Sequence, residues 1–185
     1  MDHQPTPINP AWLAFSQKRA AYHEAGHAVM AMACGCLVES VSIKRDIDGG
    51  RTHVTPLQGS SKNIRVRRVL IAAAGVGAEK AFFRGKDDSV DNVILGFKGD
   101  EAKAEAELVE MGQSGEFRLY TEYASQILHT SGYFQLVSQL AEDALRNFEI
   151  TDAHKLLSLS KQVPPLDDLT VEACHIAVDM ARRSR

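Results

Sequence analysis

The hydrophobic and polar positions of the chain repeat with two different periods, and together they predict a mainly α-helical protein with one β-hairpin. Residues 10–34 read as a long helix, with Asn9 as its N-cap, Pro10 at the first helical position and Gly35 just past its end. Residues 37–46 alternate apolar and serine positions, which is typical of a strand. An Asp-Gly-Gly turn and a short β-prone segment, 51–55, complete the predicted hairpin.

Further helices are predicted after the hairpin. They span 61–85, 100–111, 120–128, 133–148 and 151–159, and a last helix begins at Asp168 or Thr170. Residues 86–99 read as a polar loop, and Thr151 as the N-cap of the fifth of these helices. The first two long helices both have small residues at their centres, around Gly26 and Gly75. Small side chains allow close approach, so we expect these two helices to pack tightly against each other.

The composition is that of an ordinary folded protein. With 185 residues, 44% hydrophobic residues and a net charge of -3, the chain predicts one domain over 10–185, preceded by a loose tail at 1–9. The small net charge argues against a nucleic-acid partner, and no apolar stretch is long enough for a membrane span. The first residues lack the basic and apolar regions of a secretory signal.

Three cysteines, Cys34, Cys36 and Cys174, are too few and too unevenly spaced for a disulfide framework. A small odd number of cysteines favours a reducing compartment, so the sequence predicts a cytoplasmic protein.

The strongest chemical signal is His23-Glu24-Ala25-Gly26-His27, which matches the metalloprotease pattern H-E-x-x-H. On a helix, residues four apart lie on one face, so both imidazoles can reach one metal ion. Glu24 lies beside the first ligand and can act as general base toward a water on the metal. A pattern of this kind arises by chance in some sequences, but here it falls inside a predicted helix among small residues.

A catalytic zinc site needs a third protein ligand, and spacing alone leaves that ligand open. Cys34 lies about 10 Å further along the helix, too far to share the ion. Glu39, just after the helix, Glu79 in the second helix, and Asp100 at the start of a later helix are all candidates on chemical grounds. Asp100 also has a simple structural role available, as a carboxylate that stabilises a helix N-terminus.

The segment AAYHEAGHAVMA resembles the zinc-site helix of the FtsH family of ATP-dependent proteases. The segments VSIKRDIDGGRTHVTP and GAEKAFFRG resemble the strand-turn-strand and the packing helix that follow in that family, although its usual Pro-Arg-Gly turn is replaced. Gly96-Phe97-Lys98-Gly99-Asp100 is similar to the family's Gly-x-x-x-Asp segment, whose Asp is the third zinc ligand. The resemblance covers residues 15–112 well and the C-terminal helices only loosely.

This resemblance implies a helical zinc-peptidase domain with a small β-hairpin or sheet after the zinc helix. One Zn²⁺ ion would be held by His23, His27 and Asp100, with Glu24 as the catalytic residue. The chain carries no G-x-x-x-x-G-K-[ST] phosphate loop, so it looks like a stand-alone peptidase domain without the ATPase module or the membrane spans. We therefore expect ATP-independent cleavage of unfolded polypeptides, with an ATPase or unfoldase supplied in trans if folded substrates are to be degraded.

Two other functions compete with this interpretation. The first is a non-catalytic binding or regulatory module that keeps the metal only to stabilise its fold. Such a site has no use for Glu24, which argues against it. The second is a non-peptide metallohydrolase, but peptide deformylases place their Cys ligand before the motif, whereas Cys34 and Cys36 follow it. The natural substrate and the oligomeric state stay open.

We also expect an extended substrate to pair with a free strand edge beside the metal; the alternative is that the hairpin only completes the fold. The strand around Val41, Ser42 and Ile43 follows the zinc helix directly, so the sequence places that edge on this strand.

Overall fold

The computed structural model describes residues 10–45, 49–83, 97–130 and 132–185. Within these residues the chain forms seven helices and a three-stranded antiparallel sheet, which confirms the predicted mainly α (α+β) fold. The elements in chain order are α1 (Pro10–Ala33), β1 (Val38–Ile43), β2 (Gly50–Val54), α2 (Lys62–Phe83), α3 (Phe97–Glu110), α4 (Phe117–His129), α5 (Tyr133–Asn147), β3 (Glu149–Ile150), α6 (Ala153–Ser160) and α7 (Asp168–Arg183).

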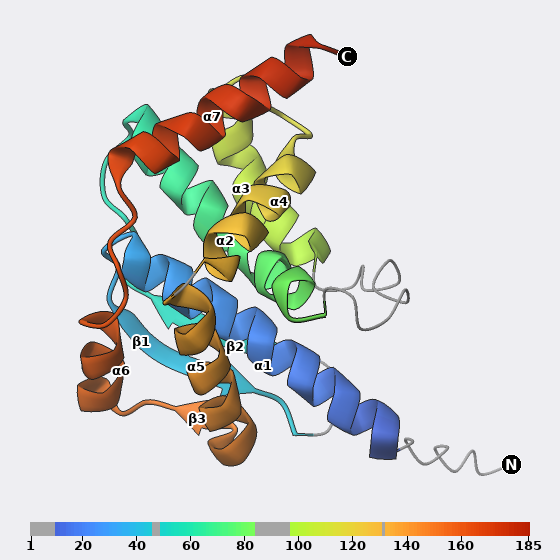
Figure 1. Ribbon diagram of the computed structural model, residues 1–185, viewed down its shortest axis with the longest axis vertical. Coiled ribbons are helices and arrows are strands. Elements are labelled where there is room, and N and C mark those ends of the chain that lie inside the picture. The colour runs from blue at the N-terminus through green and yellow to red at the C-terminus, as the bar shows by residue number, and fades with distance from the viewer. Residues whose placement is uncertain (1–9, 46–48, 84–96, 131) are drawn as a thin grey trace, which may run out of the picture.

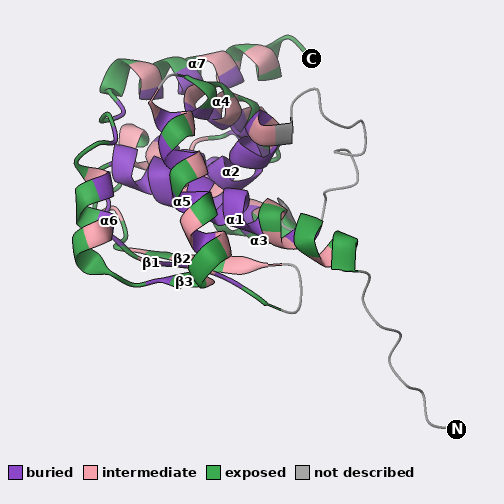
Figure 2. Ribbon diagram, turned by 60° about the horizontal axis from the view of Figure 1, so that its bottom comes forward, coloured by how far each residue is buried: buried purple, intermediate pink, exposed green. Residues whose placement is uncertain are grey.

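Helix α1 runs through the middle of the molecule (Figure 1). The sheet, α5 and α6 lie on one side of it, and α2, α3, α4 and α7 lie on the other. The central part of α1 is therefore buried from both sides, as the purple colouring in Figure 2 illustrates. This burial explains why α1 shows little amphipathic pattern: both of its faces contact other elements over residues 20–33.

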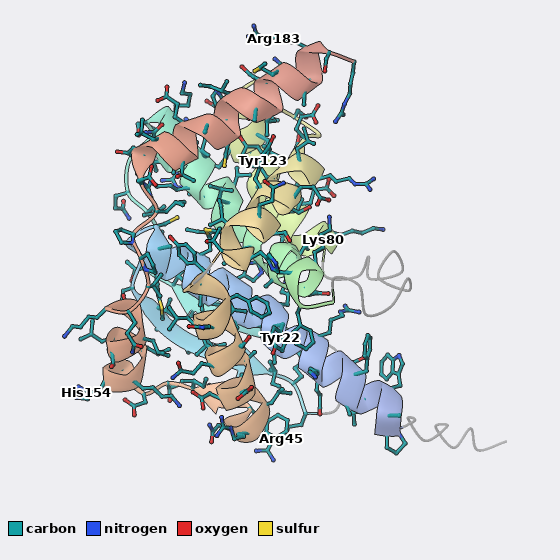
Figure 3. The ribbon with its side chains drawn as sticks, viewed as in Figure 1. Tyr22, Arg45, Lys80, Tyr123, His154 and Arg183 are labelled. Atoms are coloured by element: carbon teal, nitrogen blue, oxygen red, sulfur yellow. The ribbon has the colours of Figure 1, made fainter. Side chains whose placement is uncertain are left out.

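The small residues at the centres of α1 and α2 bring the two helices into direct contact, as expected. A Cβ atom added at Gly26 would lie 2.4 Å from the main-chain oxygen of Ala74 and 2.5 Å from Cβ of Ala78. Tyr22 of α1 (labelled in Figure 3) stacks on Phe82 of α2, with ring centroids 3.8 Å apart. This contact lies directly before the H-E-x-x-H motif, and the close approach at Gly26 lies within it, so α1 and α2 are in contact along the motif.

Helix α1 ends in a glycine cap, as the sequence predicts. Gly35 has a φ of 85°, its N–H donates to the main-chain oxygen of Met32, and the N–H of Cys36 donates to that of Ala31. This pair of hydrogen bonds is the Schellman arrangement, which releases the chain from the helix and turns it into β1.

The sheet has the order β2-β1-β3, so β1 is its central strand. Val41 pairs with Thr52 on one side and with Ile150 on the other. The prediction that β1 offers a free edge is therefore wrong. The short strand β3, which the sequence pattern did not reveal, covers that edge, and among the described residues β2 is the edge strand on the other side.

Other boundaries differ from the predicted ones. Helix α3 begins at Phe97, three residues before the predicted start, and most of the predicted loop over 86–99 lies outside the described residues. The N-cap of α6 is Asp152, whose side chain accepts a hydrogen bond from the main-chain N–H of Lys155, in place of the expected Thr151. Asp167 caps α7 in the same way through Thr170.

The three cysteines are free thiols buried in the interior. Cys34 and Cys36 follow α1 directly, and Cys174 lies on α7. Burial raises the pKa of the Cys34 thiol to about 12 and that of Cys174 to about 11. Among the described helices, none has the length and apolar character needed to cross a membrane.

Candidate metal centre

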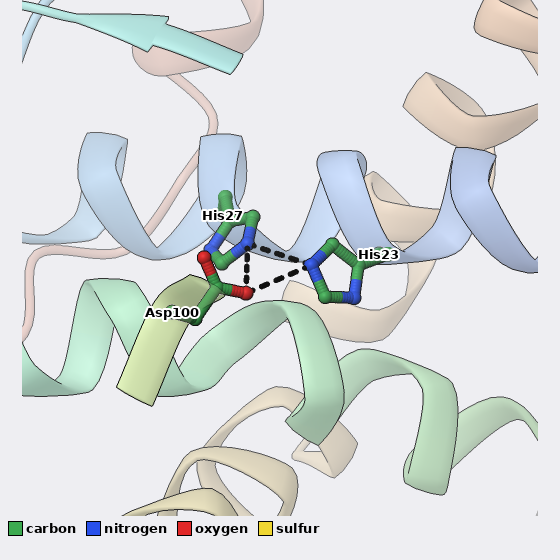
Figure 4. Close-up of side chains that lie close together, drawn as sticks. All are labelled: His23, His27 and Asp100. Atoms are coloured by element: carbon green, nitrogen blue, oxygen red, sulfur yellow. Dashed lines mark hydrogen bonds and ion pairs between the residues drawn. The ribbon is translucent and has the colours of Figure 1, made fainter. Parts of the chain in front are cut away.

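His23 and His27 lie one turn apart on α1 and both point toward α2 and α3 (Figure 4). Their Nε2 atoms are 3.0 Å apart. The helical spacing of four residues produces this convergence, because side chains at i and i+4 lie one above the other on the same face. The H-E-x-x-H motif therefore sits on a helix in the geometry that a shared metal ion requires.

Asp100, in the first turn of α3, completes the group from a distant part of the chain. Its Oδ2 atom lies 3.0 Å from Nε2 of His23 and 3.2 Å from Nε2 of His27 (dashed lines in Figure 4). The three ligand atoms thus form a nearly equilateral triangle. A tetrahedral zinc ion with bonds of about 2.0–2.1 Å separates its ligand atoms by about 3.3–3.4 Å, so the triangle is close to one face of such a site.

The hydrogen bonds behind the two imidazoles turn their Nε2 atoms toward the centre. Nδ1 of His27 lies 2.7 Å from the main-chain oxygen of Ile71, which can only accept a hydrogen bond, so Nδ1 carries the proton. Nδ1 of His23 lies 2.6 Å from Oε1 of Glu79 and donates to that carboxylate. In a neutral imidazole the proton on Nδ1 leaves a lone pair on Nε2, which is the form that binds metals.

Three acceptor atoms that face one point favour a positive charge there. Burial alone would lower the pKa of His23, but the carboxylates of Asp100 and Glu79 outweigh it and raise that pKa to about 10. Burial likewise opposes ionisation of Asp100, yet the hydrogen bonds from His23 and His27 hold the pKa of its carboxyl below the usual range. The site therefore stabilises a cation, and a metal ion that binds there must displace the proton.

Gly75 of α2 lies directly against the two imidazoles and leaves the space beside their Nε2 atoms free of side-chain atoms of its own. A Cβ atom added at Gly75 would lie 2.5 Å from Nε2 of His23 and 2.5 Å from Nε2 of His27. Any other residue at this position would therefore place its Cβ atom against both histidine Nε2 atoms. Among the described residues, His23, His27 and Asp100 are the group whose ligand atoms could hold a metal ion, and the cradle at Gly75 fits that role.

Glu79 and Arg19 support the metal ligands from behind. Oε1 of Glu79 accepts the hydrogen bond of His23, and its Oε2 lies 3.0 Å from Nε of Arg19. Lys103 supports Asp100 in the same manner: its Nζ lies 3.1 Å from Oδ1, the carboxylate oxygen that does not face the histidines. These contacts orient the ligands and leave Oδ2 of Asp100 directed at the histidines.

Glu24 lies on the sheet side of α1, against β2. The hydroxyl Oγ1 of Thr52 lies 2.8 Å from Oε2 of Glu24 and 2.9 Å from its main-chain oxygen. A Cβ atom added at Gly50 would lie 2.6 Å from Cγ of Glu24, so the side chain of Glu24 rests directly on this glycine. Two residues of β2 thus define where the carboxylate of Glu24 lies.

An open cleft of about 790 Å³ brings these groups together. Its walls come from α1, from β2, and from the start of α3, with α2 behind the histidines; the lining includes His23, Glu24, His27, Asp100, Ile71, Arg68 and residues 49–54. The edge strand β2 therefore runs along the cleft, beside both the candidate metal ligands and Glu24.

The structure separates the candidate metal ligands of the sequence into those that converge and those that do not. The structure brings His23, His27 and Asp100 together, and places Glu24 in the same cleft. Glu79 contacts the outer nitrogen of His23 and does not join the triangle. Glu39 is exposed on β1, where it accepts a hydrogen bond from Thr55.

Sequence reasoning missed the contacts of Thr52, Gly75 and Ile71. A threonine in a strand and a glycine among small helical residues carry no chemical signal of their own. A main-chain carbonyl such as that of Ile71 has no sequence signature at all.

Comparison with known proteins adds no relative. No protein-family model matches the chain, and no curated protein matches it. The resemblance to FtsH proteases therefore rests on the motifs in the sequence alone.

Proposed function

We propose that the protein is a zinc-dependent endopeptidase that hydrolyses peptide bonds of unfolded proteins or peptides. The observation that carries the proposal is the combined geometry of one cleft. It holds two histidine Nε2 atoms and a carboxylate oxygen at metal-ligand spacing, with a glutamate and a free strand edge beside them. The resemblance of the α1 segment to FtsH proteases supports the same activity.

His23, His27 and Asp100 would hold the ion, and two nitrogens with one carboxylate oxygen form a donor set that suits zinc. When bound, zinc supplies Lewis acidity that polarises the scissile carbonyl and makes water a nucleophile near neutral pH. Three protein ligands leave a fourth position for substrate or water, as catalytic zinc sites do.

Glu24 acts as the general base in this proposal. Its carboxylate takes a proton from the attacking water and passes it to the nitrogen of the leaving amine, so that the C–N bond breaks without releasing an unstable amide anion. Glu24 is separate from the ligand triangle and is free for this role. A site that used the metal only to stabilise the fold would not need it.

The outer edge of β2, left unpaired by the strands that the structure describes, supports a polypeptide substrate. On β1, the N–H of Ile43 donates to Phe148 on the β3 side, whereas the N–H of Lys44 donates to Gly49 on the β2 side. Main-chain groups of successive strand residues alternate in direction, so Gly49 faces β1 and the groups of Gly50 and Thr52 face away from it. An extended peptide can pair with them, which requires a substrate segment that is locally unfolded.

Metal analysis and digestion assays on the same preparations test the proposal. Purified protein should bind one zinc ion per chain and cleave casein or a peptide library without ATP, and His27→Ala and Asp100→Ala should lose the metal. Glu24→Gln should keep zinc and lose about 10²–10⁴-fold in turnover. Glu39→Gln is the matched control, because Glu39 is an exposed carboxylate outside the cleft, and it should behave like the parent protein.

Two results would redirect the assignment. A zinc-loaded parent protein that cleaves no unfolded polypeptide would favour a non-catalytic zinc-containing binding or regulatory module. Full zinc occupancy in Asp100→Ala would move the third ligand elsewhere, and Glu79 would be tested next.

A further inference from the structure

We propose that Thr52 is a positioning residue for the general base: its side-chain hydroxyl fixes the carboxylate of Glu24 in the cleft, while its main chain belongs to the edge that receives the substrate. This inference rests on the proposed peptidase function. It concerns how the reaction is organised and assigns a role to a strand residue outside the H-E-x-x-H motif.

Glu24 is a buried carboxylate, with 7% of its surface exposed, and its described side-chain hydrogen bond comes from Thr52. Oε2 accepts the hydrogen bond from Oγ1 of Thr52 at 2.8 Å. Among the described residues no hydrogen bond to Oε1 is present, so this second oxygen is left to receive the proton of the attacking water. The hydroxyl of Thr52 is thus the side-chain donor that determines which oxygen is engaged and which is free.

A glutamate needs such a contact because its side chain has three rotatable bonds. Gly50 limits the position of the Glu24 side chain, because Cγ of Glu24 occupies the space that a Cβ atom of residue 50 would need. The hydroxyl of Thr52 also lies 2.9 Å from the main-chain oxygen of Glu24, so its one proton faces two acceptors of the same residue on the helix that carries the histidines. A base held within a fraction of an ångström of its working position is worth a large rate factor, since a misplacement of about 1 Å can cost about 10²-fold.

Thr52 also lies where the base and the substrate meet. Its side chain points to α1, whereas its main-chain groups face the open edge of β2 that would pair with an extended peptide. The same residue therefore sets the distance between the scissile carbonyl and the carboxylate that activates water. We expect the side chain to affect kcat and the main chain to affect substrate binding.

Two substitutions separate the hydroxyl from the shape of the side chain. Thr52→Val keeps the branched shape and the strand main chain but removes the donor, whereas Thr52→Ser keeps the donor. Thr52→Val should lower kcat by about 10–100-fold with KM and zinc content close to those of the parent protein. Thr52→Ser should restore most of kcat, and Thr55→Val, the same change three residues further along and outside the cleft lining, should have no effect.

A second measurement does not depend on turnover. Crystal structures of the metal-free variants should show the Glu24 carboxylate beside β2 in Thr52→Ser and displaced from it in Thr52→Val. The inference is overturned if Thr52→Val keeps the parent kcat, if Thr52→Ser loses as much as Thr52→Val, or if the carboxylate stays in place in both structures. A parent protein that cleaves no polypeptide contradicts the peptidase function instead, and the crystal structures then still decide whether Thr52 holds Glu24.

Discussion

Gly75 makes the candidate metal site sterically feasible. The residue is in the middle of α2, where glycine costs about 1 kcal/mol of helix stability relative to alanine. Its missing side chain leaves open the space within 2.5 Å of both histidine Nε2 atoms. An alanine here would press its Cβ against the two histidine side chains of α1, so the glycine is required wherever these imidazoles face α2.

Gly75→Ala should therefore weaken metal binding while the protein stays folded. We expect a loss of zinc affinity at least as large as the roughly 10–100-fold typical of changes next to a ligand, measured by competition with a chromophoric chelator. Gly77→Ala is the matched control on the same helix, because its added methyl would contact the main chain of Ser125 and Ala124 on α4.

The Gly77→Ala control should lower the free energy of unfolding, measured in urea, by about 1–3 kcal/mol because the added methyl overpacks the contact with α4. Its zinc affinity should be unchanged. Equal zinc affinities in the parent protein and in Gly75→Ala would contradict the placement of the ion at this glycine.

At the scale of single residues, the sequence reveals only what is local. His23, Glu24 and His27 are readable because their spacing is a property of one helix. Asp100 and Glu79 are both carboxylates in helices, and nothing in spacing distinguishes a ligand from the residue that hydrogen-bonds to a ligand. Only the packing of α3 and α1 against α2 makes Asp100 the third member of the triangle and Glu79 the partner of Nδ1 of His23.

At the scale of elements, the β-hairpin was predictable but its free edge was not. The alternation of apolar and polar residues identifies β1 and β2, because strand periodicity is local. Which edge stays open depends on β3, a two-residue strand contributed by a much later part of the chain. The left-handed conformation of Phe148, with a φ of 62°, ends α5 and turns the chain into β3, and no turn residue in the sequence announces it.

The basic residues at the start of α2 show the same dependence on context. Cations at a helix N-terminus oppose the helix dipole, so these residues need partners outside their own helix. In the structure, Arg65 and Arg68 both bind Glu107 of α3, at 2.8 Å and 2.7 Å. The ion pairs hold α3, the helix that carries Asp100, against α2.

The edge of β2, which no described strand covers, predicts a two-residue pattern in substrate recognition. Only alternate residues of a paired peptide direct their N–H groups at β2, so N-methylation of the substrate at those positions should remove a hydrogen bond. Loss of one such bond is worth about 0.5–1.5 kcal/mol, or roughly 2–12-fold in KM. A set of peptides methylated at single positions around the scissile bond measures this, and KM values without alternation would argue against strand pairing.

At the scale of the whole molecule, the candidate ion joins elements that are far apart in sequence. His23 and His27 lie on the central helix α1, and Asp100 lies on α3, which packs on the opposite side of α1 from the sheet. A ligand that binds the folded chain and not the unfolded one stabilises the fold by mass action. Metal binding should therefore appear as stability of the entire protein.

Zinc should raise the melting temperature of the protein. At a free concentration of about 100 times Kd the gain is about 2.7 kcal/mol, which corresponds to a rise of about 5–11 °C for a chain of this size class. Differential scanning calorimetry with zinc and with a chelator measures it, and the shift should disappear in His27→Ala. A shift of equal size in His27→Ala would mean that zinc binds at another place.

The buried thiols have a consequence for following the protein's motions in solution. Cys34 and Cys36 adjoin the end of the central helix, and Cys174 lies on the last helix, so two regions distant in sequence each carry a chemical probe. Burial shields these sulfurs, so opening of the surrounding segment should speed their reaction with a water-soluble alkylating reagent. The reagent attacks the thiolate, which the raised pKa of Cys34 and Cys174 makes scarce. Labelling rates of the unaltered chain therefore report, at two places separately, how often the structure opens.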